Sequence, residues 1–149
     1  MSGASATDAR SHLRQALTAP GTRFEVVEED VRGVRLPVFR NRARSVRTLL
    51  ERSARFGDRT YVIDGEVRLD FSTHLAHVAA VAAWLRDERG VQRGERVAIF
   101  AENRWEWIVA YWAAVSIGAV PAAFNGWWTA EEYAHAATLV EPVLLLADE

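Results

Sequence analysis

The sequence has 149 residues, of which 50% are apolar and 26% are charged, and its formal net charge is −2. This length suits one compact domain or one part of a larger protein, and the composition is that of a globular chain. The small net charge predicts no steering toward nucleic acid. All eighteen basic residues are arginine and cysteine is absent. Within this chain, that excludes a catalytic lysine, thiolate catalysis, cysteine-ligated zinc and disulfide bonds.

The N-terminal 21 residues lack the apolar core of a signal peptide. The longest apolar stretch, residues 108–120, contains Ser116 and Gly118, is followed by Pro121, and is too short to span a bilayer. We therefore expect a cytoplasmic protein without a transmembrane segment.

The first half of the chain predicts helices alternating with short hairpins. A helix over 8–18 ends near Pro20, and FEVVEED and VRLPVF form two strands around a turn at Arg32-Gly33. A helix over 46–56 stops at Gly57. Asp64-Gly65 then supplies the tight turn of a hairpin that pairs 60–63 with 66–71. Asp70 or Ser72 caps a helix over 73–89, whose apolar stripe is Leu75, Val78, Ala79, Ala82 and Leu85.

Arginine is concentrated in one part of this half. Nine arginines fall between Arg32 and Arg59, against Glu51 and Asp58 as acids. The run is either a solvated face that pairs with acidic neighbours or a patch for nucleic acid or anionic lipid. We favour the solvated face, because charge runs alone are weak signals and no aromatic residues are spaced to stack on bases.

The second half predicts a β-α-β-α-β succession. VAIF (97–100) is a wholly apolar strand, followed by a helix over 104–117 that Asn103 caps and that is apolar nearly all round, as in a buried helix. AVPAAF (119–124) is the next strand. Thr129 and Glu132 form a capping box for a helix that ends near Val140, and VLLLA (143–147) is the last strand. The fold class is α/β: a parallel βαβαβ portion with right-handed crossovers, preceded by a helix and β-hairpins.

Such a portion leaves apolar surface without a cover. Three strands and two helices cannot bury both faces of a sheet, yet VAIF and VLLLA are fully apolar. We therefore expect these residues to be the front part of a larger protein.

The search for reactive groups yields no catalytic constellation. His12, His74, His77 and His135 read as surface or boundary residues, and His74 and His77, three apart on one helix, lack further metal ligands nearby. Glu102, Glu106, Glu131 and Glu132 read as acids placed for helix dipoles. The turn Ala101-Glu102-Asn103 has no glycine, and no glycine-rich phosphate loop is present elsewhere.

The loop FNGWWT (124–129) is the most distinctive segment. Two tryptophans follow the carboxyl end of a strand, where open parallel sheets bind ligands. One interpretation is packing against the rest of a larger fold, and the other is a wall of a ligand site.

Several motifs in their order and spacing resemble the AMP-dependent synthetase and ligase family, the adenylate-forming acyl-CoA synthetases. They are Gly90-Val91, then Gly94-Glu95-Arg96-Val97-Ala98-Ile99, Asn103 with Glu106-Trp107, and Gly118-Ala119-Val120 with Asn125. The upstream stretch SVRTLLERSARFGDRTYVIDGE is similar to the family's opening helix and hairpin. The likeness covers 24–149, a truncated first part of the N-terminal domain, and leaves 1–23 as an N-terminal extension.

The resemblance implies an acid–CoA ligase that forms an acyl-adenylate from ATP with Mg²⁺ and then transfers the acyl group to CoA. Family likeness puts the phosphate loop and the lysine downstream, so the resemblance implies no catalytic residue and no cofactor held by this chain. It places Asn125, Gly126 and Trp127 in a loop on the CoA side. The implied partners are the remainder of the parent polypeptide and a fatty acid or related carboxylate, and a homo-oligomer stays open. The alternative is a small non-catalytic module that pairs through its open sheet edge.

Overall fold

The computed structural model describes residues 3–148, which fall into two compact units that divide between Arg44 and Ser45. In the first unit, helix α1 (Gly3–Thr18) is followed by an antiparallel hairpin of β1 (Val26–Val31) and β2 (Val34–Phe39). Arg32 and Gly33 form the turn, with φ of 55° and 85°. Positive φ at both positions matches the twist of the flanking strands, so the predicted hairpin is confirmed.

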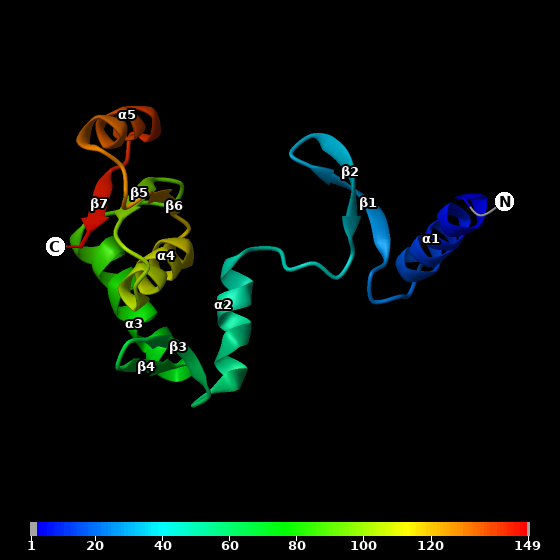
Figure 1. The fold of residues 1–149 in the computed structure, drawn as a ribbon, viewed down its shortest axis with the longest axis horizontal. Helices are drawn as coiled ribbons and strands as arrows, with labels where there is room; N and C mark the ends of the chain where they lie inside the picture. The colour runs from blue at the N-terminus through cyan, green and yellow to red at the C-terminus, as the bar shows by residue number, and fades with distance from the viewer. Residues whose placement is uncertain (1–2, 149) are drawn as a thin grey trace. The chain divides into compact units, whose positions relative to one another are not determined.

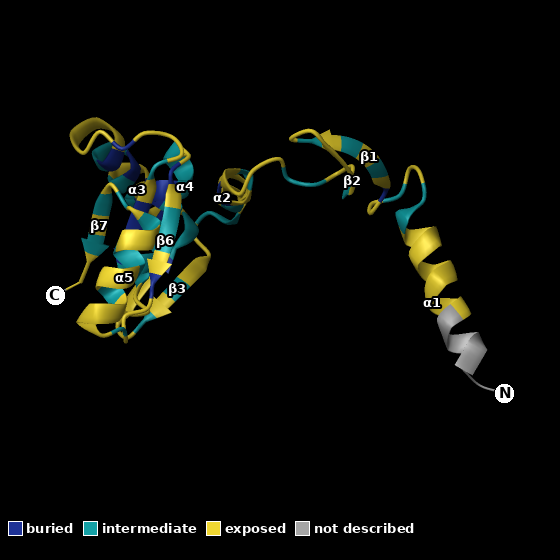
Figure 2. Ribbon diagram, turned by 90° about the horizontal axis from the view of Figure 1, so that it is seen from above, coloured by how far each residue is buried: buried dark blue, intermediate teal, exposed yellow. Residues whose placement is uncertain are grey.

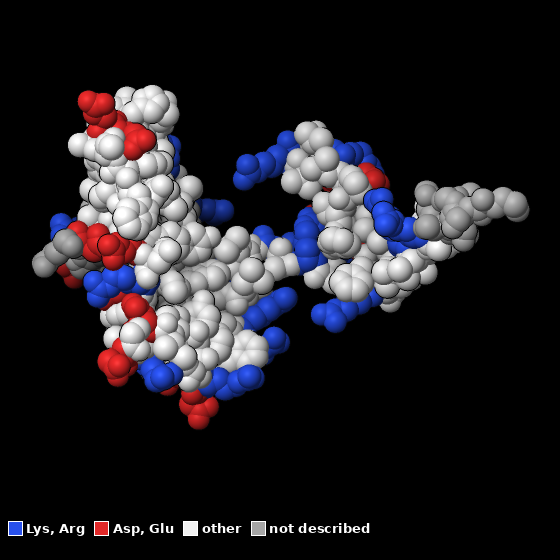
Figure 3. All heavy atoms as spheres, in the orientation of Figure 1, with Lys and Arg blue, Asp and Glu red and all other residues white. Residues whose placement is uncertain are grey.

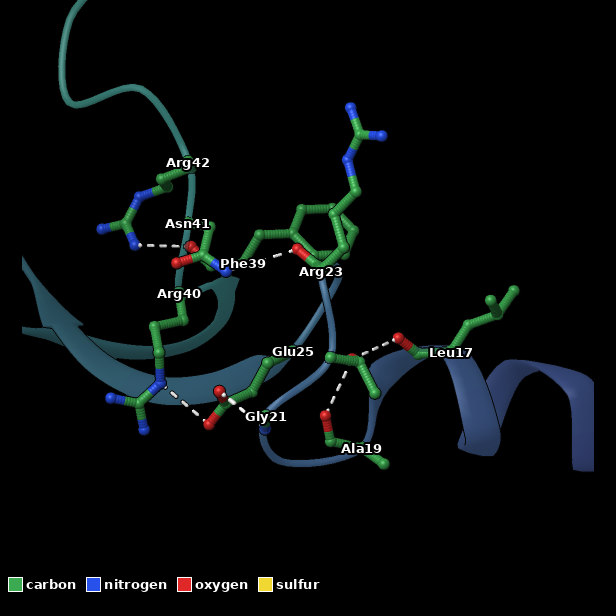
Figure 4. A network of polar contacts seen from close by, with 10 residues as sticks. Leu17, Ala19, Gly21, Arg23, Glu25, Phe39, Arg40, Asn41 and Arg42 are labelled. Carbon is green, nitrogen blue, oxygen red and sulfur yellow. Dashed lines mark hydrogen bonds and ion pairs between the residues drawn. The ribbon is translucent and has the colours of Figure 1, made fainter.

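A polar network around Glu25 ties the loop after α1 to the hairpin (Figure 4). The carboxylate of Glu25 accepts a hydrogen bond from the Gly21 amide at 3.1 Å and pairs with Arg40 at 2.8 Å, and the Arg40 amide donates to the Glu25 carbonyl at 2.8 Å. Glu25 is 8% exposed. A carboxylate this buried needs such partners, so the network fixes the loop on the hairpin.

Four of the nine arginines in the run form ion pairs with described acids: Arg40, Arg42, Arg44 and Arg47. Besides Arg40, Arg42 pairs with Glu29 at 2.8 Å, and Arg47 pairs with Glu51 at 2.8 Å on one helix. Figure 3 shows arginine side chains around the hairpin of the first unit.

The second unit holds the remaining elements. Before the parallel sheet these are α2 (Arg47–Ser53), a 3₁₀ turn (Ala54–Phe56), β3 (Thr60–Asp64), β4 (Val67–Asp70), α3 (Phe71–Ala83) and a π-helical turn (Trp84–Glu88). The sheet portion is β5 (Arg96–Phe100), α4 (Trp105–Ile117), β6 (Val120–Phe124), α5 (Ala130–Val140) and β7 (Leu144–Ala147). The predicted capping box is present, with Thr129 and Glu132 bonded reciprocally. None of the described helices is long and apolar enough to cross a membrane.

The hairpin of β3 and β4 differs from the prediction by one residue. Asp64 pairs with Val67, so the turn consists of Gly65 and Glu66, with Gly65 at φ 55°. Phe71, expected to end the strand, begins α3, because the Asp70 carboxylate caps that helix by accepting from the Thr73 amide at 2.6 Å.

The parallel sheet has the strand order β6-β5-β7, with Ala98 opposite both Ala122 and Leu145. Central β5 is buried on both faces, and Val97, Ala98 and Ile99 are at most 1% exposed. Figure 1 shows α5 above the strands and α3 and α4 below them. The βαβαβ prediction is therefore confirmed.

The core lies between the sheet and the helices α3 and α4. Figure 2 shows dark blue, buried segments on these elements. The residues that pack together there are Ala82, Leu85, Val91, Val97, Ala113, Ala114 and Ala119. Helix α4, predicted to be buried, is buried along its small residues, whereas Trp107, Tyr111 and Trp112 are half-buried. The rings of Trp107 and Tyr111 stack at 5.6 Å, and Trp112 packs against the second buried cluster of Leu50, Val78 and Val109.

Candidate functional site

A crevice opens at the point where two neighbouring strands send their connections to opposite faces of the sheet. After β5 the chain turns to α4, which packs on the face that carries Val97. After β6 it turns to α5, whose Tyr133 contacts Phe100 and Phe124 on the other face at ring distances of 5.3 and 5.6 Å. In open α/β sheets ligands bind at such a switch point, outside the carboxyl ends of the strands.

The two loops that diverge there enclose a hollow of about 790 Å³. It is lined by Ala101, Glu102, Asn103, Trp107, Ala123, Phe124, Asn125, Gly126, Trp127 and Trp128. All three predicted site residues, Asn125, Gly126 and Trp127, are therefore brought together at the crevice. The prediction did not include Glu102, Asn103 and Trp107, which also line the crevice. These residues follow β5, the strand next to β6, and that position in the sequence could have identified them.

The two tryptophans of the loop have different environments. Trp128 is half-buried and its ring lies 5.4 Å from that of Phe124. Trp127 is 91% exposed. Trp128 therefore packs within the described fold, which neither interpretation predicted, and the Trp127 indole is available to a ligand or to a further segment.

Asn125 and Gly126 shape the loop. The Asn125 side-chain oxygen accepts a hydrogen bond from the Trp127 amide at 3.1 Å, and its carbonyl accepts from the Trp128 amide at 3.0 Å. A Cβ at Gly126 would lie 3.4 Å from the Ala101 carbonyl oxygen, so the two loops approach closely at this point.

Within the described residues, the crevice has one charged side chain in its lining, Glu102, and no basic group. The Glu102 amide donates to the Asp148 carboxylate at 2.8 Å, which places a second acid after β7 near this edge. Acids without a cation disfavour phosphate, whereas indole faces and the Asn125 amide suit a flat, uncharged group.

The prediction that Asn103 caps α4 is wrong. The helix begins one residue later than expected, Arg104 holds the cap position without a side-chain bond, and the Trp105 amide donates to the Asp64 carboxylate at 3.2 Å. The cap comes from the β3–β4 hairpin, 41 residues away, so sequence spacing could not reveal it. Asn103 is left to line the crevice.

The histidines supply no catalytic group at the crevice. The prediction that His74 is a surface or boundary residue is wrong: it is 1% exposed, and neither ring nitrogen has a hydrogen-bond partner among the residues that the structure describes. Its ring lies 4.7 Å from that of Tyr61. Burial, together with the nearby His77, lowers the pKa of His74 below its usual value. Among the described residues, no three His, Asp or Glu side chains are placed to hold a metal ion.

Comparison with protein families matches residues 49–149 to the family described as "AMP-binding enzyme". A ligase of Rhodococcus jostii, 3-[(3aS,4S,7aS)-7a-methyl-1,5-dioxo-octahydro-1H-inden-4-yl]propanoyl:CoA ligase, is 38% identical over 56% of this chain and 16% of its own length. The medium/long-chain-fatty-acid–CoA ligase FadD6 of Mycobacterium tuberculosis is 32% identical over 66% of this chain and 16% of its own length. The chain thus spans about a sixth of these relatives.

Solved structures share the fold. The NpsA N-terminal subdomain of Klebsiella oxytoca, in complex with 3-hydroxyanthranilyl-AMSN, superposes with a TM-score of 0.68 at 22% identity, over 72% of this chain and 28% of that one. VinN superposes with a TM-score of 0.67 at 24% identity, over 70% of this chain and 28% of that one. At these identities the likeness shows the fold alone.

Proposed function

This chain belongs to the AMP-binding enzyme family, and on that basis we propose that it forms the first α/β part of an ATP-dependent acid–CoA ligase. In the proposed reaction a carboxylate oxygen attacks the α-phosphorus of ATP, which gives an acyl-adenylate and releases pyrophosphate. The CoA thiol then attacks the acyl carbon, the thioester forms, and AMP leaves.

The observation that carries this proposal is the family match over 49–149, which coincides with the second compact unit. Two of the relatives are named as CoA ligases. A fatty acid or a related carboxylic acid is the substrate class we propose. The remainder of the parent polypeptide is the proposed partner, a homo-oligomer stays a further proposal, and the proposed location is the cytoplasm.

We assign the crevice at the switch point to the CoA side of the reaction. The exposed Trp127 indole offers a face on which a flat group can stack, and Asn125 and Gly126 hold it there. The acidic character of the crevice indicates that it takes an uncharged part of CoA, with the CoA phosphates bound by other groups.

The groups that react with ATP belong to other segments in this proposal. The charge on a transferring phosphoryl group is stabilised mainly by electrostatic interactions with a metal cation, a lysine and backbone amides. The chain has no lysine, and the described crevice has no basic side chain. We therefore expect the 149-residue chain to be inactive alone, with ATP, Mg²⁺ and CoA acting in the parent enzyme.

A second candidate function is a small binding module that pairs through its open sheet edges. Strands β6 and β7 are both edges of the described sheet, and Leu145 on β7 is 40% exposed. Exposed edges and apolar faces favour association. A stable, cooperatively unfolding homodimer of the 149-residue chain would favour this function.

A substrate survey of the parent enzyme tests the leading proposal. Acyl-adenylates trapped with hydroxylamine would be measured for straight-chain acids of increasing length and for aromatic acids. We expect product with straight-chain acids. Product with aromatic acids alone would contradict the fatty-acid assignment, and no product with any carboxylate would contradict the ligase.

A further inference from the structure

The first unit carries an apolar patch that its own fold leaves open. It consists of Leu13 and Leu17 on α1 with Phe24 and Phe39 from the hairpin, and these side chains are 61%, 46%, 47% and 52% exposed. They line one shallow groove together with Arg10 and Arg14. Four large apolar side chains at one place, each about half exposed, differ from the scattered exposure of ordinary surfaces.

The patch is held in place by the loop that follows α1. Thr22 donates its hydroxyl hydrogen bond to the Leu17 and Ala19 carbonyls at 2.6 and 2.8 Å, and the Asn41 side chain donates to the Arg23 carbonyl at 3.4 Å (Figure 4). The Phe24 and Phe39 rings contact edge to face at 6.4 Å. These hydrogen bonds and the ring contact therefore fix the positions of the apolar side chains on the surface of the first unit.

The rim of the patch is basic. Arg10 and Arg14 line the groove, and the Arg23 guanidinium lies 5.6 Å from the centre of the Phe24 ring. None of these three arginines forms an ion pair with a described residue, in contrast to Arg40 and Arg42. No acid is among the described residues that line the groove. Asp8 precedes Leu17 by nine residues, about two and a half helical turns, and therefore lies on the opposite side of α1.

We propose that this patch docks the protein on an anionic lipid surface. A helix with leucines on one face and arginines beside them lies in the membrane interface, where the apolar side chains enter the acyl boundary and the arginines meet anionic headgroups. The arginine stems also cover apolar surface while their guanidinium groups stay in water. Arg10, Arg14 and Arg23, which pair with no described acid, complement the negative charge of the lipid headgroups. An RNA partner is less favoured, because aliphatic Leu13 and Leu17 form the exposed centre of the patch.

Co-sedimentation of the 149-residue chain with vesicles tests this proposal. We expect it to sediment with phosphatidylcholine vesicles that contain phosphatidylglycerol, to stay in solution with phosphatidylcholine alone, and to bind less at high salt. The double variant Leu13→Ser/Leu17→Ser should lose sedimentation at all salt concentrations. The variant Arg10→Gln/Arg14→Gln should bind anionic vesicles about thirtyfold more weakly, since each of the two basic residues contributes about 1 kcal/mol near the surface.

A matched control tests whether the loss of two positive charges alone weakens vesicle binding. Arg52→Gln/Arg55→Gln removes the same charge from exposed positions of the second unit and should bind like the unchanged chain. An equal loss in this control would overturn the proposal, as would sedimentation of the Leu13/Leu17 variant. A fall in the melting temperature of the Leu13→Ser/Leu17→Ser variant would show that the chain itself covers the patch, and would overturn the proposal. Binding of the chain to RNA without binding to vesicles would assign the patch to nucleic acid, and would also overturn the proposal.

Discussion

Trp127 and Trp128 are adjacent in the sequence, yet one indole is 91% exposed and the other packs on Phe124. Sequence reasoning left packing and ligand contact as alternatives for both residues, because a WW pair after a strand fits either. The turn held by the Asn125 side chain directs the two successive indoles differently, so only Trp128 packs within the described fold. The position of the loop after a strand therefore predicted the crevice, whereas the local turn geometry determines which of the two indoles is exposed.

Replacing Trp127 by alanine in the parent enzyme should raise the KM for CoA. Stacking of an aromatic side chain on a base contributes about 1–3 kcal/mol, so the rise should be about fivefold or more. The melting temperature should stay unchanged, because the indole has few partners in the described fold. Steady-state kinetics and thermal unfolding measure the two quantities.

Trp128→Ala is the matched control for that variant, and it should lower the melting temperature because Trp128 packs on Phe124. A Trp127→Ala enzyme with unchanged kinetics and a large drop in melting temperature would contradict the ligand-contact role.

His74 should make the stability of the second unit depend on pH. Burial lowers its pKa in the folded state, so the unfolded chain binds more protons as the pH falls. Stability should be full above the unfolded pKa of about 6.5 and should decrease as the pH falls below it toward the lowered folded pKa. Urea unfolding followed by tryptophan fluorescence reports this unit, since all six tryptophans lie within it.

His74→Leu should flatten that pH dependence and stabilise the unit at low pH, because it removes a buried imidazole without hydrogen-bond partners. His135→Gln, at an exposed position of α5, should leave the pH profile as it is. A His74→Leu profile with the original slope would show that another group carries the effect.

At the scale of elements, local patterns predicted the strands and helices, and the errors arose where distant segments meet. The βαβαβ succession and the capping box at Thr129 depend on periodicity and on residues three apart, so they were predictable. The cap of α4 was not, because Asp64 reaches Trp105 from a separate hairpin. His74 was misread for a similar reason: its burial depends on Tyr61 of β3, and the helix pattern alone does not show this.

The bond from Asp64 to the start of α4 should stabilise the second unit. Asp64→Ala leaves the Trp105 amide without its partner and should lower the free energy of unfolding by about 1 kcal/mol, as for other lost helix caps. Asp64→Asn keeps an acceptor oxygen but loses the charge that favours a helix N-terminus, so its effect should be smaller. Urea unfolding of the three proteins measures this, and equal stabilities would contradict the cap.

At the scale of the whole molecule, the described sheet has more apolar surface than it covers. Val143 and Leu145 around β7 are 54% and 40% exposed, and Leu139 on α5 is 71% exposed. We propose that these surfaces contact further segments of a parent polypeptide, since the chain matches the family over 49–149 and spans about a sixth of two relatives. The expectation that 24–48 also belongs to the family stays a prediction, since the match begins at residue 49.

The account depends on a division between a binding wall, which this chain supplies, and the groups that react with ATP. ATP–pyrophosphate exchange tests it most directly, with fatty acids as substrates for the 149-residue chain and for the parent enzyme. We predict no exchange above background for the 149-residue chain and clear exchange for the parent. Exchange catalysed by the 149-residue chain itself would contradict the account.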